Sequence, residues 1–331
     1  MSDRRLHLPA LTAALKAAGE ETRLRILALI AEAELTVSDL TEILRQSQPR
    51  LSRHLRLLTE AGLVERFREG SWAFFRLGER GSAADIARAL AARLDPDDPT
   101  MRRDRARLAA VRNARAQAAQ NYFRRHAAEW DRIRQLHVAD AAVEAAIRSA
   151  LADGPIYSLL DLGTGTGRML ELFAGDIERG LGLDLSLEML ALARARLDRA
   201  GLKHLSVRHG DIYDLALPRD SFDVVIIHQV LHFLDDSARA ISEAARVLRP
   251  GGRLLVVDFA PHDLEFLRAE HAHRRLGFAA ETVTQWLNAA GLNVTRQQTL
   301  PPGPEGKIAV ALWLARDPRT LLASQATREV A

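Results

Sequence analysis

The chain has no cysteine among its 331 residues. Without thiolates it cannot form disulfides, zinc ribbons or iron–sulfur sites, and it cannot use a cysteine nucleophile. No segment approaches the ~18 consecutive apolar residues that a membrane helix requires. The N-terminal segment has two early arginines but neither a long apolar run nor a small-residue cleavage site. We therefore expect no signal peptide, no membrane association and a cytoplasmic location.

Charge is distributed unevenly around a formal net value of +3. Residues 1–100 carry 15 basic and 15 acidic side chains, residues 101–150 carry 11 and 5, and residues 151–331 carry 20 and 23. From Arg45 to Arg56 there are four arginines and one histidine but no acid. The length favours two domains, and the 47% hydrophobic and 27% charged content is typical of a globular protein.

The first eighty residues predict several short helices followed by a β-hairpin. Thr36 can cap a short helix with Asp39 at the capping-box position, and Pro49 and Gly62 suit the start and the end of the next helix. Two short strands, LVERFRE and WAFFRL, then flank a turn. This order of elements is that of a winged helix-turn-helix, whose second helix enters the major groove of DNA.

The second helix of this unit carries the residues expected to contact DNA. Planar donors and hydroxyls at its start can read base edges or bind phosphate, although a basic helix can also be a merely solvated face. The expected DNA-binding residues are Gln48, Arg50, Ser52, Arg53, His54, Arg56 and, in the hairpin, Arg68. Further phosphate contacts are expected from Arg66 and Arg76. The expected buried side chains are Leu51, Leu55, Leu57 and Leu58 in the helix, and Trp72, Phe74 and Phe75 in the hairpin.

The segments TRLRILALI, ELTVSDLTEIL and QPRLSRHLRLLTEAGLVERFREGSWAFFRL together resemble the ArsR/SmtB-type bacterial transcriptional regulators over about residues 10–95. This resemblance implies operator DNA as a partner and a homodimer formed through residues 8–18 and 82–94. Metal-sensing members often carry two cysteines in the segment that matches Glu34–Leu40, where this chain has Thr36 and Ser38. Hydroxyls do not replace thiolates for soft metals, so we predict no metal site.

The pattern of apolar and polar residues changes after an Ala- and Arg-rich helical segment at residues 100–150. Beyond Gly154, apolar strand-like runs alternate with helix-like segments, which predicts a mostly parallel sheet covered by helices. The fold class expected is α/β, with an N-terminal all-α winged helix-turn-helix and a C-terminal doubly wound Rossmann-like unit. The predicted domains are residues 1–95 (DNA-binding), 96–150 (helical connector and lid), 151–316 (the α/β unit) and 317–331 (a tail).

A glycine-rich loop marks the candidate ligand site. The strand YSLLDL leads into the loop Gly163-Thr164-Gly165-Thr166-Gly167 and then a helix, and Asp184 ends the following strand. Glycines let the backbone approach a ligand, and a carboxylate at that strand tip can hold two ribose hydroxyls. Dinucleotide enzymes and S-adenosylmethionine enzymes share this geometry. We expect Asp184 to face a cleft and to support no core packing.

The motifs DLGTGTG, HGDI, SFDVVIIHQVLHFL and ARVLRPGGRLLVVDF occur in an order that resembles class I S-adenosylmethionine-dependent methyltransferases across about residues 120–315. The resemblance implies S-adenosylmethionine or S-adenosylhomocysteine as ligand and no metal. It places the methionine part against Asp161, Gly163, Thr164, Gly165 and Gly167. It places the ribose on Asp184 and the adenine beside Leu185, Met189, Asp211 and Ile212.

The helix NYFRRHAAEWDRIR resembles the segment that closes over the ligand in such enzymes, although Tyr122, Phe123 and Trp130 can equally bury it against the sheet. His228 and His232 follow the fourth strand, where a histidine can pack on the ligand or act as a general base. No catalytic residue is assigned, because methyl transfer needs mainly proximity and orientation.

Three functions are compatible with these features. The first is a transcription factor regulated by S-adenosylmethionine or S-adenosylhomocysteine. The second is an active small-molecule methyltransferase that regulates its own gene. The third is a structural dimer without DNA binding, which the basic helix and the hairpin disfavour. The lack of cysteine argues against methylation of arsenite and of cytosine C5.

Overall fold

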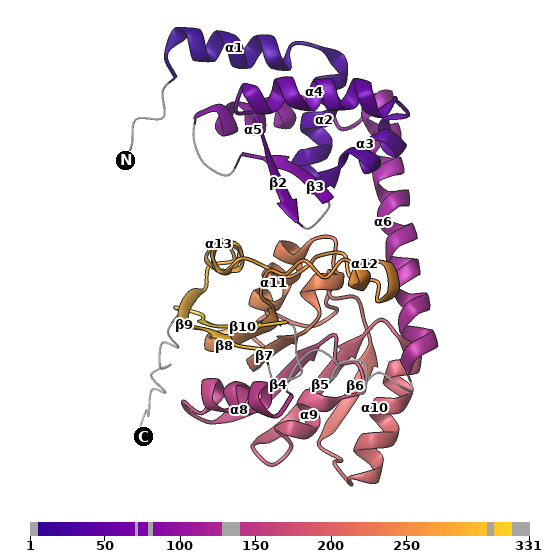
Figure 1. Ribbon diagram of the computed structural model, residues 1–331. Coiled ribbons are helices and arrows are strands. Elements are labelled where there is room, and N and C mark those ends of the chain that lie inside the picture. Colours follow the sequence, from indigo (N-terminus) through magenta and orange to yellow (C-terminus); the bar gives the residue numbers. More distant parts are fainter. Residues whose placement is uncertain (1–5, 70–71, 79–81, 128–139, 303–307, 320–331) are drawn as a thin grey trace, which may run out of the picture. The chain divides into compact units, whose positions relative to one another are not determined.

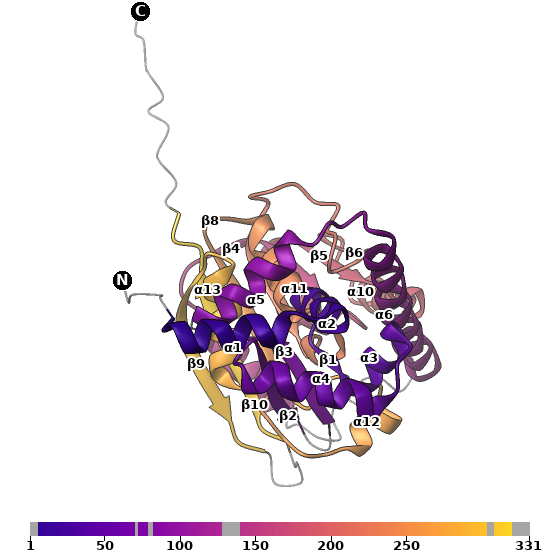
Figure 2. The same ribbon diagram turned by 90° about the horizontal axis from the view of Figure 1, so that it is seen from above.

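The structure is a computed structural model that describes residues 6–69, 72–78, 82–127, 140–302 and 308–319. It divides into two compact units, residues 1–118 and 119–331. The division falls inside one long helix, α6 (Pro99–His126), which Figures 1 and 2 draw without interruption. This helix therefore supplies residues to both units. The domain limits expected at residues 95, 150 and 316 stay predictions.

The first unit combines short helices with a three-stranded antiparallel sheet in the order β1-β3-β2 (Figure 1). Besides the first part of α6, its elements are α1 (Leu8–Ala18), α2 (Glu21–Glu32), β1 (Leu35–Thr36), α3 (Val37–Leu44), α4 (Gln48–Glu60), β2 (Val64–Glu69), β3 (Trp72–Leu77) and α5 (Ser82–Arg93). The helix-turn-helix and the hairpin occur in the order predicted.

Local sequence signals explain how α3 and α4 begin and end. Thr36 Oγ1 accepts the N–H of Asp39 at 3.2 Å, and Asp39 Oδ2 accepts the N–H of Thr36 at 2.9 Å, which completes the predicted capping box. Gly62, at φ 70°, follows α4 in the left-handed conformation that glycine favours. The two-residue strand β1 was not predicted, since so short a segment shows no periodicity.

The buried positions of this unit differ from expectation at two side chains. Leu51, Leu55 and Leu58 are buried as predicted, whereas Leu57 is half-buried because it lies beside the stripe that their three- and four-residue spacing forms. Trp72 was expected in the core and is 41% exposed. It begins β3 at the outer end of the hairpin, where it stacks on the buried Phe74 with ring centroids 6.1 Å apart.

The second unit is built on a seven-stranded sheet in the order β6-β5-β4-β7-β8-β10-β9. Its strands are β4 (Ile156–Leu162), β5 (Ile177–Asp184), β6 (Leu205–His209), β7 (Phe222–His228), β8 (Leu248–Phe259), β9 (Asn293–Leu300) and β10 (Val310–Arg316). Its helices are α8 (Asp140–Leu151), α9 (Arg168–Leu172), α10 (Leu187–Arg199), η2 (Leu231–Phe233), α11 (Ser237–Val247), α12 (Phe266–Glu270) and α13 (Ala280–Ala289).

The sheet is parallel from β6 to β8 and antiparallel at β10 and β9. Two apolar cores form on its faces: α8, α9 and α10 pack on one, and α11 and α13 pack on the other (Figure 1). The chain proceeds from β4 outward to β6 and then returns to β7 on the other side of β4. In a sheet of this kind ligands bind at the carboxyl ends of the strands where the direction reverses, which here is between β4 and β7.

The edge strand β9 was not predicted. Its residues, NVTRQQTL, alternate between exposed and half-buried positions, and they lack the apolar run by which the other strands were recognised. Among the residues described, no helix is both long and apolar enough to cross a membrane.

Candidate functional site

The exposed face of α4 carries most of the residues expected to contact DNA. Ser47 precedes the helix as its N-cap. The side chains exposed on this face are Gln48, Arg50, Ser52, Arg53 and Arg56. Because the leucines of the opposite face are buried, these polar groups form one outward surface at the start of the helix. Arg56 lies 3.7 Å from Glu60, but both groups are exposed, and such pairs are weak.

His54 points away from that surface. Its Nδ1 lies 3.6 Å from Oε2 of Glu20, and the ring is half-buried. Burial lowers the pKa of His54, and Glu20 opposes that shift. In this structure His54 therefore packs α4 against the start of α2, instead of facing outward with the arginines.

The hairpin presents Arg66 and Arg68 as exposed side chains, but Arg76 is engaged within the unit. Nε of Arg76 donates to Oε2 of Glu65 at 3.3 Å, and its guanidinium lies 5.1 Å from the ring centre of Phe67. Arg76 therefore stabilises the pairing of β2 and β3, which the sequence pattern did not indicate.

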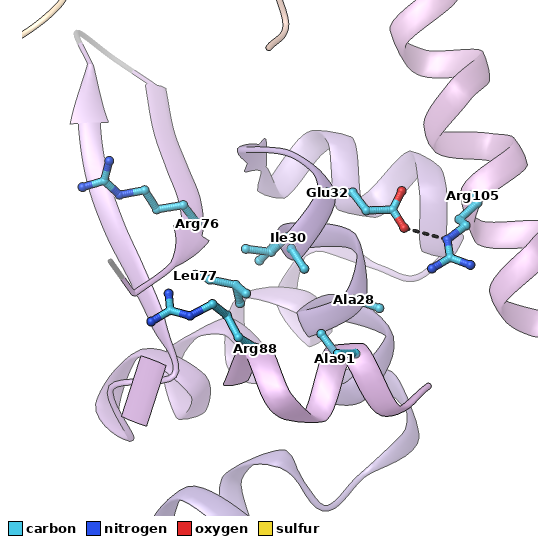
Figure 3. Close-up of a pocket in the computed structure, with 10 residues that line it drawn as sticks. Ala28, Ile30, Glu32, Arg76, Leu77, Arg88, Ala91 and Arg105 are labelled. Carbon is cyan, nitrogen blue, oxygen red and sulfur yellow. Dashed lines mark hydrogen bonds and ion pairs between the residues drawn. The ribbon is translucent and has the colours of Figure 1, made fainter. Parts of the chain in front are cut away.

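The first unit also contains an open pocket of about 460 Å³ between α2, β3, α5 and the start of α6 (Figure 3). Its three arginines all have partners. Arg105 donates to Glu32 at 2.6 Å, Arg88 to the carbonyl of Gly78 at 2.7 Å, and Arg76 to Glu65. The polar wall of this pocket therefore does not point to a particular ligand.

In the second unit, β4 runs directly into the predicted glycine loop. Gly163, Gly165 and Gly167 have φ values of 71°, 53° and 82°, the region that disfavours other residues. The loop lies across the end of β5, because the N–H groups of Gly163 and Thr164 donate to the carbonyl of Leu183 at 2.8 and 2.9 Å. A Cβ atom on Gly163 would lie 2.4 Å from Cγ2 of Val230, so the loop requires glycine there.

Asp161 and Thr164 hold the base of this loop together. Thr164 Oγ1 donates to Oδ2 of Asp161 at 2.6 Å, and both side chains are buried. A Cβ atom on Gly182 of β5 would lie 2.6 Å from the same hydroxyl oxygen. Thr164 thus fills space that only a glycine in the neighbouring strand leaves open, and Asp161 lies at the end of β4 beside it.

Asp184 holds the loop to the tip of β5. Its Oδ2 accepts the N–H of Gly165 and its Oδ1 accepts the N–H of Ser186, each at 2.8 Å. Burial raises the pKa of Asp184, and these two donors oppose that shift. The carboxylate therefore organises the loop, and a carboxylate oxygen can accept more than one hydrogen bond.

The residues expected around the adenine differ in exposure. Leu185 is exposed and Met189 is buried in the first turn of α10, which Ser186 caps. Asp211 is exposed after β6, where its Oδ1 accepts the N–H of Tyr213 at 2.9 Å. Ile212 beside it is buried. The structure thus brings Asp184, Leu185, Met189 and Asp211 to the carboxyl ends of β5 and β6.

Histidines gather beyond β7 and β8. His228 ends β7 and is half-buried. His232 is buried, and its Nδ1 lies 2.8 Å from Oδ1 of the buried Asp258. The rings of Phe233, Phe259 and His273 surround it at centroid distances of 4.0 to 4.7 Å.

The partner of His232, Asp258, was not predicted as a site residue. It lies near the end of β8, which is parallel to and paired with β7, and the sequence separation of 26 residues conceals the contact. His262 lies close by, and burial, reinforced by His232, lowers its pKa to about 4.

Among the described residues no cluster of three or more metal-ligating side chains occurs. Tyr122 and Phe123 lie in α6, whereas Trp130 falls outside the described residues.

Comparison with known proteins assigns both units. Residues 20–66 match the bacterial regulatory protein, arsR family, and residues 160–256 match a methyltransferase domain. An arsenite methyltransferase of Aquipseudomonas alcaligenes is 40% identical over 122 residues, which are 34% of this chain and 35% of that protein. A probable S-adenosylmethionine-dependent methyltransferase of Mycolicibacterium smegmatis is 37% identical over 183 residues, or 54% of this chain and 62% of that protein.

A phosphatidylethanolamine N-methyltransferase of Cereibacter sphaeroides is 32% identical over 152 residues, which are 44% of this chain and 74% of that protein. The chain spans only about a third of the length of the Aquipseudomonas protein and about three fifths of the length of the Mycolicibacterium protein. The chain therefore belongs to the S-adenosylmethionine-dependent methyltransferases, and it joins to that unit a helix-turn-helix of the arsR family of bacterial regulators.

Proposed function

We propose that this protein is a transcriptional regulator whose operator affinity depends on S-adenosylmethionine or S-adenosylhomocysteine bound in its methyltransferase unit. One observation carries the proposal: a single chain presents an outward polar face on α4 and, in its other unit, a glycine loop tied to Asp184. A protein with both features links DNA binding to a ligand when the ligand prefers one DNA-binding state. Such a regulator acts in the cytoplasm, on the chromosome.

The ligand would lie over the ends of β4, β5 and β6. The backbone at Gly163 and Gly165 offers the cradle for the methionine part, because both glycines adopt the positive φ that lets the chain turn at the end of β4, and Asp161 would meet the amino group. Asp184 would hold the ribose hydroxyls. The remaining proposed contacts are Thr164, Gly167, Leu185, Met189, Asp211, Ile212 and His228. S-adenosylmethionine supplies an electrophilic methyl group on sulfur, which S-adenosylhomocysteine lacks.

On the DNA side we propose that Gln48, Arg50, Ser52, Arg53 and Arg56 enter the major groove while Arg68 meets the backbone. His54 would contribute through its packing. A homodimer formed by residues 8–18 and 82–94 would match a symmetric operator. Its support is the face of α1, where Leu8 and Leu15, two turns apart, are 76% and 49% exposed.

Calorimetry and DNA binding test this function together. The affinity for S-adenosylmethionine and for S-adenosylhomocysteine is measured by calorimetry. The affinity for a duplex, selected from random sequence by the full chain, is then measured with and without each ligand. We expect both ligands to bind and at least one of them to change the duplex affinity by about fivefold or more. Equal duplex affinity under saturating concentrations of either ligand would show that the ligand does not regulate DNA binding.

The pair His232–Asp258 favours a second function, that of an active small-molecule methyltransferase. When Nδ1 of His232 donates to Asp258, Nε2 keeps its lone pair and can accept a proton from an acceptor molecule. Transfer of labelled methyl groups to a panel of phenols and quinols tests this. We expect the wild-type chain to transfer methyl groups and Asp258→Asn to do so at least about tenfold more slowly. Equal rates in both proteins would remove the pair from the reaction.

We predict that zinc, cadmium and arsenite leave operator affinity unchanged. Thr36 is occupied as the N-cap of α3, Ser38 offers a hydroxyl, and the chain has no cysteine to bind soft metals. The same reasoning makes arsenite a poor methyl acceptor, although one relative carries that activity in its name. Fluorescence anisotropy with stoichiometric metal checks the prediction, and release of the duplex would contradict it.

A further inference from the structure

We infer that α6 is the element through which ligand binding in the methyltransferase unit alters the helix-turn-helix. This inference rests on the proposed ligand-regulated DNA binding. It adds the route by which the ligand acts. The helix supplies residues to both compact units, and in each unit these residues contact the elements that matter for function.

In the first unit, α6 is anchored by a buried ion pair. Asp104 is fully buried, and its two oxygens accept Nε and Nη2 of Arg25 in α2 at 2.7 and 2.8 Å. Leu108 and Val111 continue the same stripe of α6 into the apolar core of this unit. A buried carboxylate needs its partner, so a displacement of this part of α6 would also displace α2 or separate the pair.

Two arginines of the same part of α6 contact both ends of α3. Arg115 donates to Asp39, the residue that completes the capping box of α3. Arg107 donates to the carbonyl of Ile43 in the last turn of α3 at 3.0 Å. Since α3 packs on α4, a shift of α6 would also shift α4, the helix proposed to read DNA.

In the second unit, the last turn of α6 contacts both sides of the candidate ligand site. Arg124 lies 3.2 Å from Glu188, which precedes Met189 in the first turn of α10. Phe123 packs edge-to-face on Phe233, the neighbour of His232, with ring centroids 4.8 Å apart.

A partly buried hydrogen bond fixes the same turn of α6. The hydroxyl of Tyr122 lies 2.7 Å from Nδ1 of His271. Burial raises the pKa of Tyr122 to about 12 and lowers that of His271, which favours the uncharged form of both partners. A movement of α10 or η2 around a bound ligand would therefore also displace the last turn of α6.

A helix transmits such a change only while its backbone hydrogen bonds are continuous. Ala114 and Ala118 are exposed positions of α6 between the two sets of contacts. Glycine is a much poorer helix former than alanine, so the double variant Ala114→Gly/Ala118→Gly softens α6 without removing a side-chain contact described above. The double variant Ala142→Gly/Ala145→Gly makes the same change at exposed positions of α8 and serves as the control.

The experiment measures the Kd for S-adenosylhomocysteine by calorimetry and the Kd for the selected duplex with and without that ligand. In Ala114→Gly/Ala118→Gly we expect ligand affinity within about twofold of wild type and a ligand effect on duplex affinity reduced at least about threefold. The α8 control keeps the full effect. Tyr122→Phe loses only the hydroxyl and should also reduce the ligand effect on duplex affinity. This variant tests the inference if the glycine variant unfolds.

The wild-type measurement separates the two proposals. If the ligand changes duplex affinity in wild type and equally in the α6 variants, ligand regulation holds and α6 is not its route. If the effect falls as much in the α8 control as in the α6 variant, it depends on general stability and the inference is overturned. If wild type shows no effect, the proposed regulation fails and this inference fails with it.

Discussion

Replacing Asp184 with alanine is expected to lower affinity for S-adenosylmethionine and S-adenosylhomocysteine together by at least about tenfold. Charge-assisted hydrogen bonds contribute roughly 1.5–3 kcal/mol each, and the ribose they would hold is common to both ligands. The loss has a second source, because the carboxylate also accepts the N–H groups of Gly165 and Ser186. We therefore expect a lower free energy of unfolding as well.

Calorimetry with both ligands and a urea unfolding curve separate these two effects. Glu178→Ala is the matched control, since Glu178 is an exposed carboxylate on the same strand β5. It should leave ligand affinity and stability unchanged. If Asp184→Ala binds both ligands as the wild type does, the adenosine lies elsewhere and the proposed site is wrong.

Arg53→Ala is expected to abolish selective binding of the operator while the methyltransferase unit still binds its ligand. Arg53 is exposed in the first turns of α4, and a residue that contacts a base contributes roughly 1–3 kcal/mol of discrimination. Binding curves for the selected duplex and for a scrambled duplex, each at several salt concentrations, measure selectivity apart from general electrostatic attraction.

Arg102→Ala serves as the control for Arg53→Ala, because Arg102 is an exposed arginine of α6 and its loss changes the net charge equally. It should lower the affinity for both duplexes slightly and preserve their ratio. Retention of the wild-type ratio in Arg53→Ala would mean that α4 does not read the operator.

Local signals in the sequence predicted the elements that position both sites. The capping residues Thr36 and Asp39 predicted α3, and the strand–glycine–helix pattern predicted the loop after β4. These predictions succeeded because each depends on residues close together in the chain. The polar edge strand β9 was missed because its alternation lacks apolar residues.

Contacts between distant segments could not be predicted in the same way. Asp184 and Gly165 meet because β4 and β5 are parallel neighbours, and Asp258 meets His232 through the pairing of β7 and β8. Arg25 and Asp104 are 79 residues apart. A single sequence shows the charges but not which of them become partners, so His54 and Arg76 were expected to face DNA although both pack within their unit.

The buried pair Arg25–Asp104 has a consequence for folding during synthesis. Domains generally fold as units while the chain emerges from the ribosome. Here the segment that matches the arsR family ends at residue 66, yet Arg25 and Asp39 can pair with Asp104 and Arg115 of α6 only when residues 104 and 115 have emerged. A nascent chain halted after α5 would hold a helix-turn-helix that lacks these two ion pairs. The DNA-binding unit therefore reaches its full stability only after translation of the helix that leads into the methyltransferase has begun.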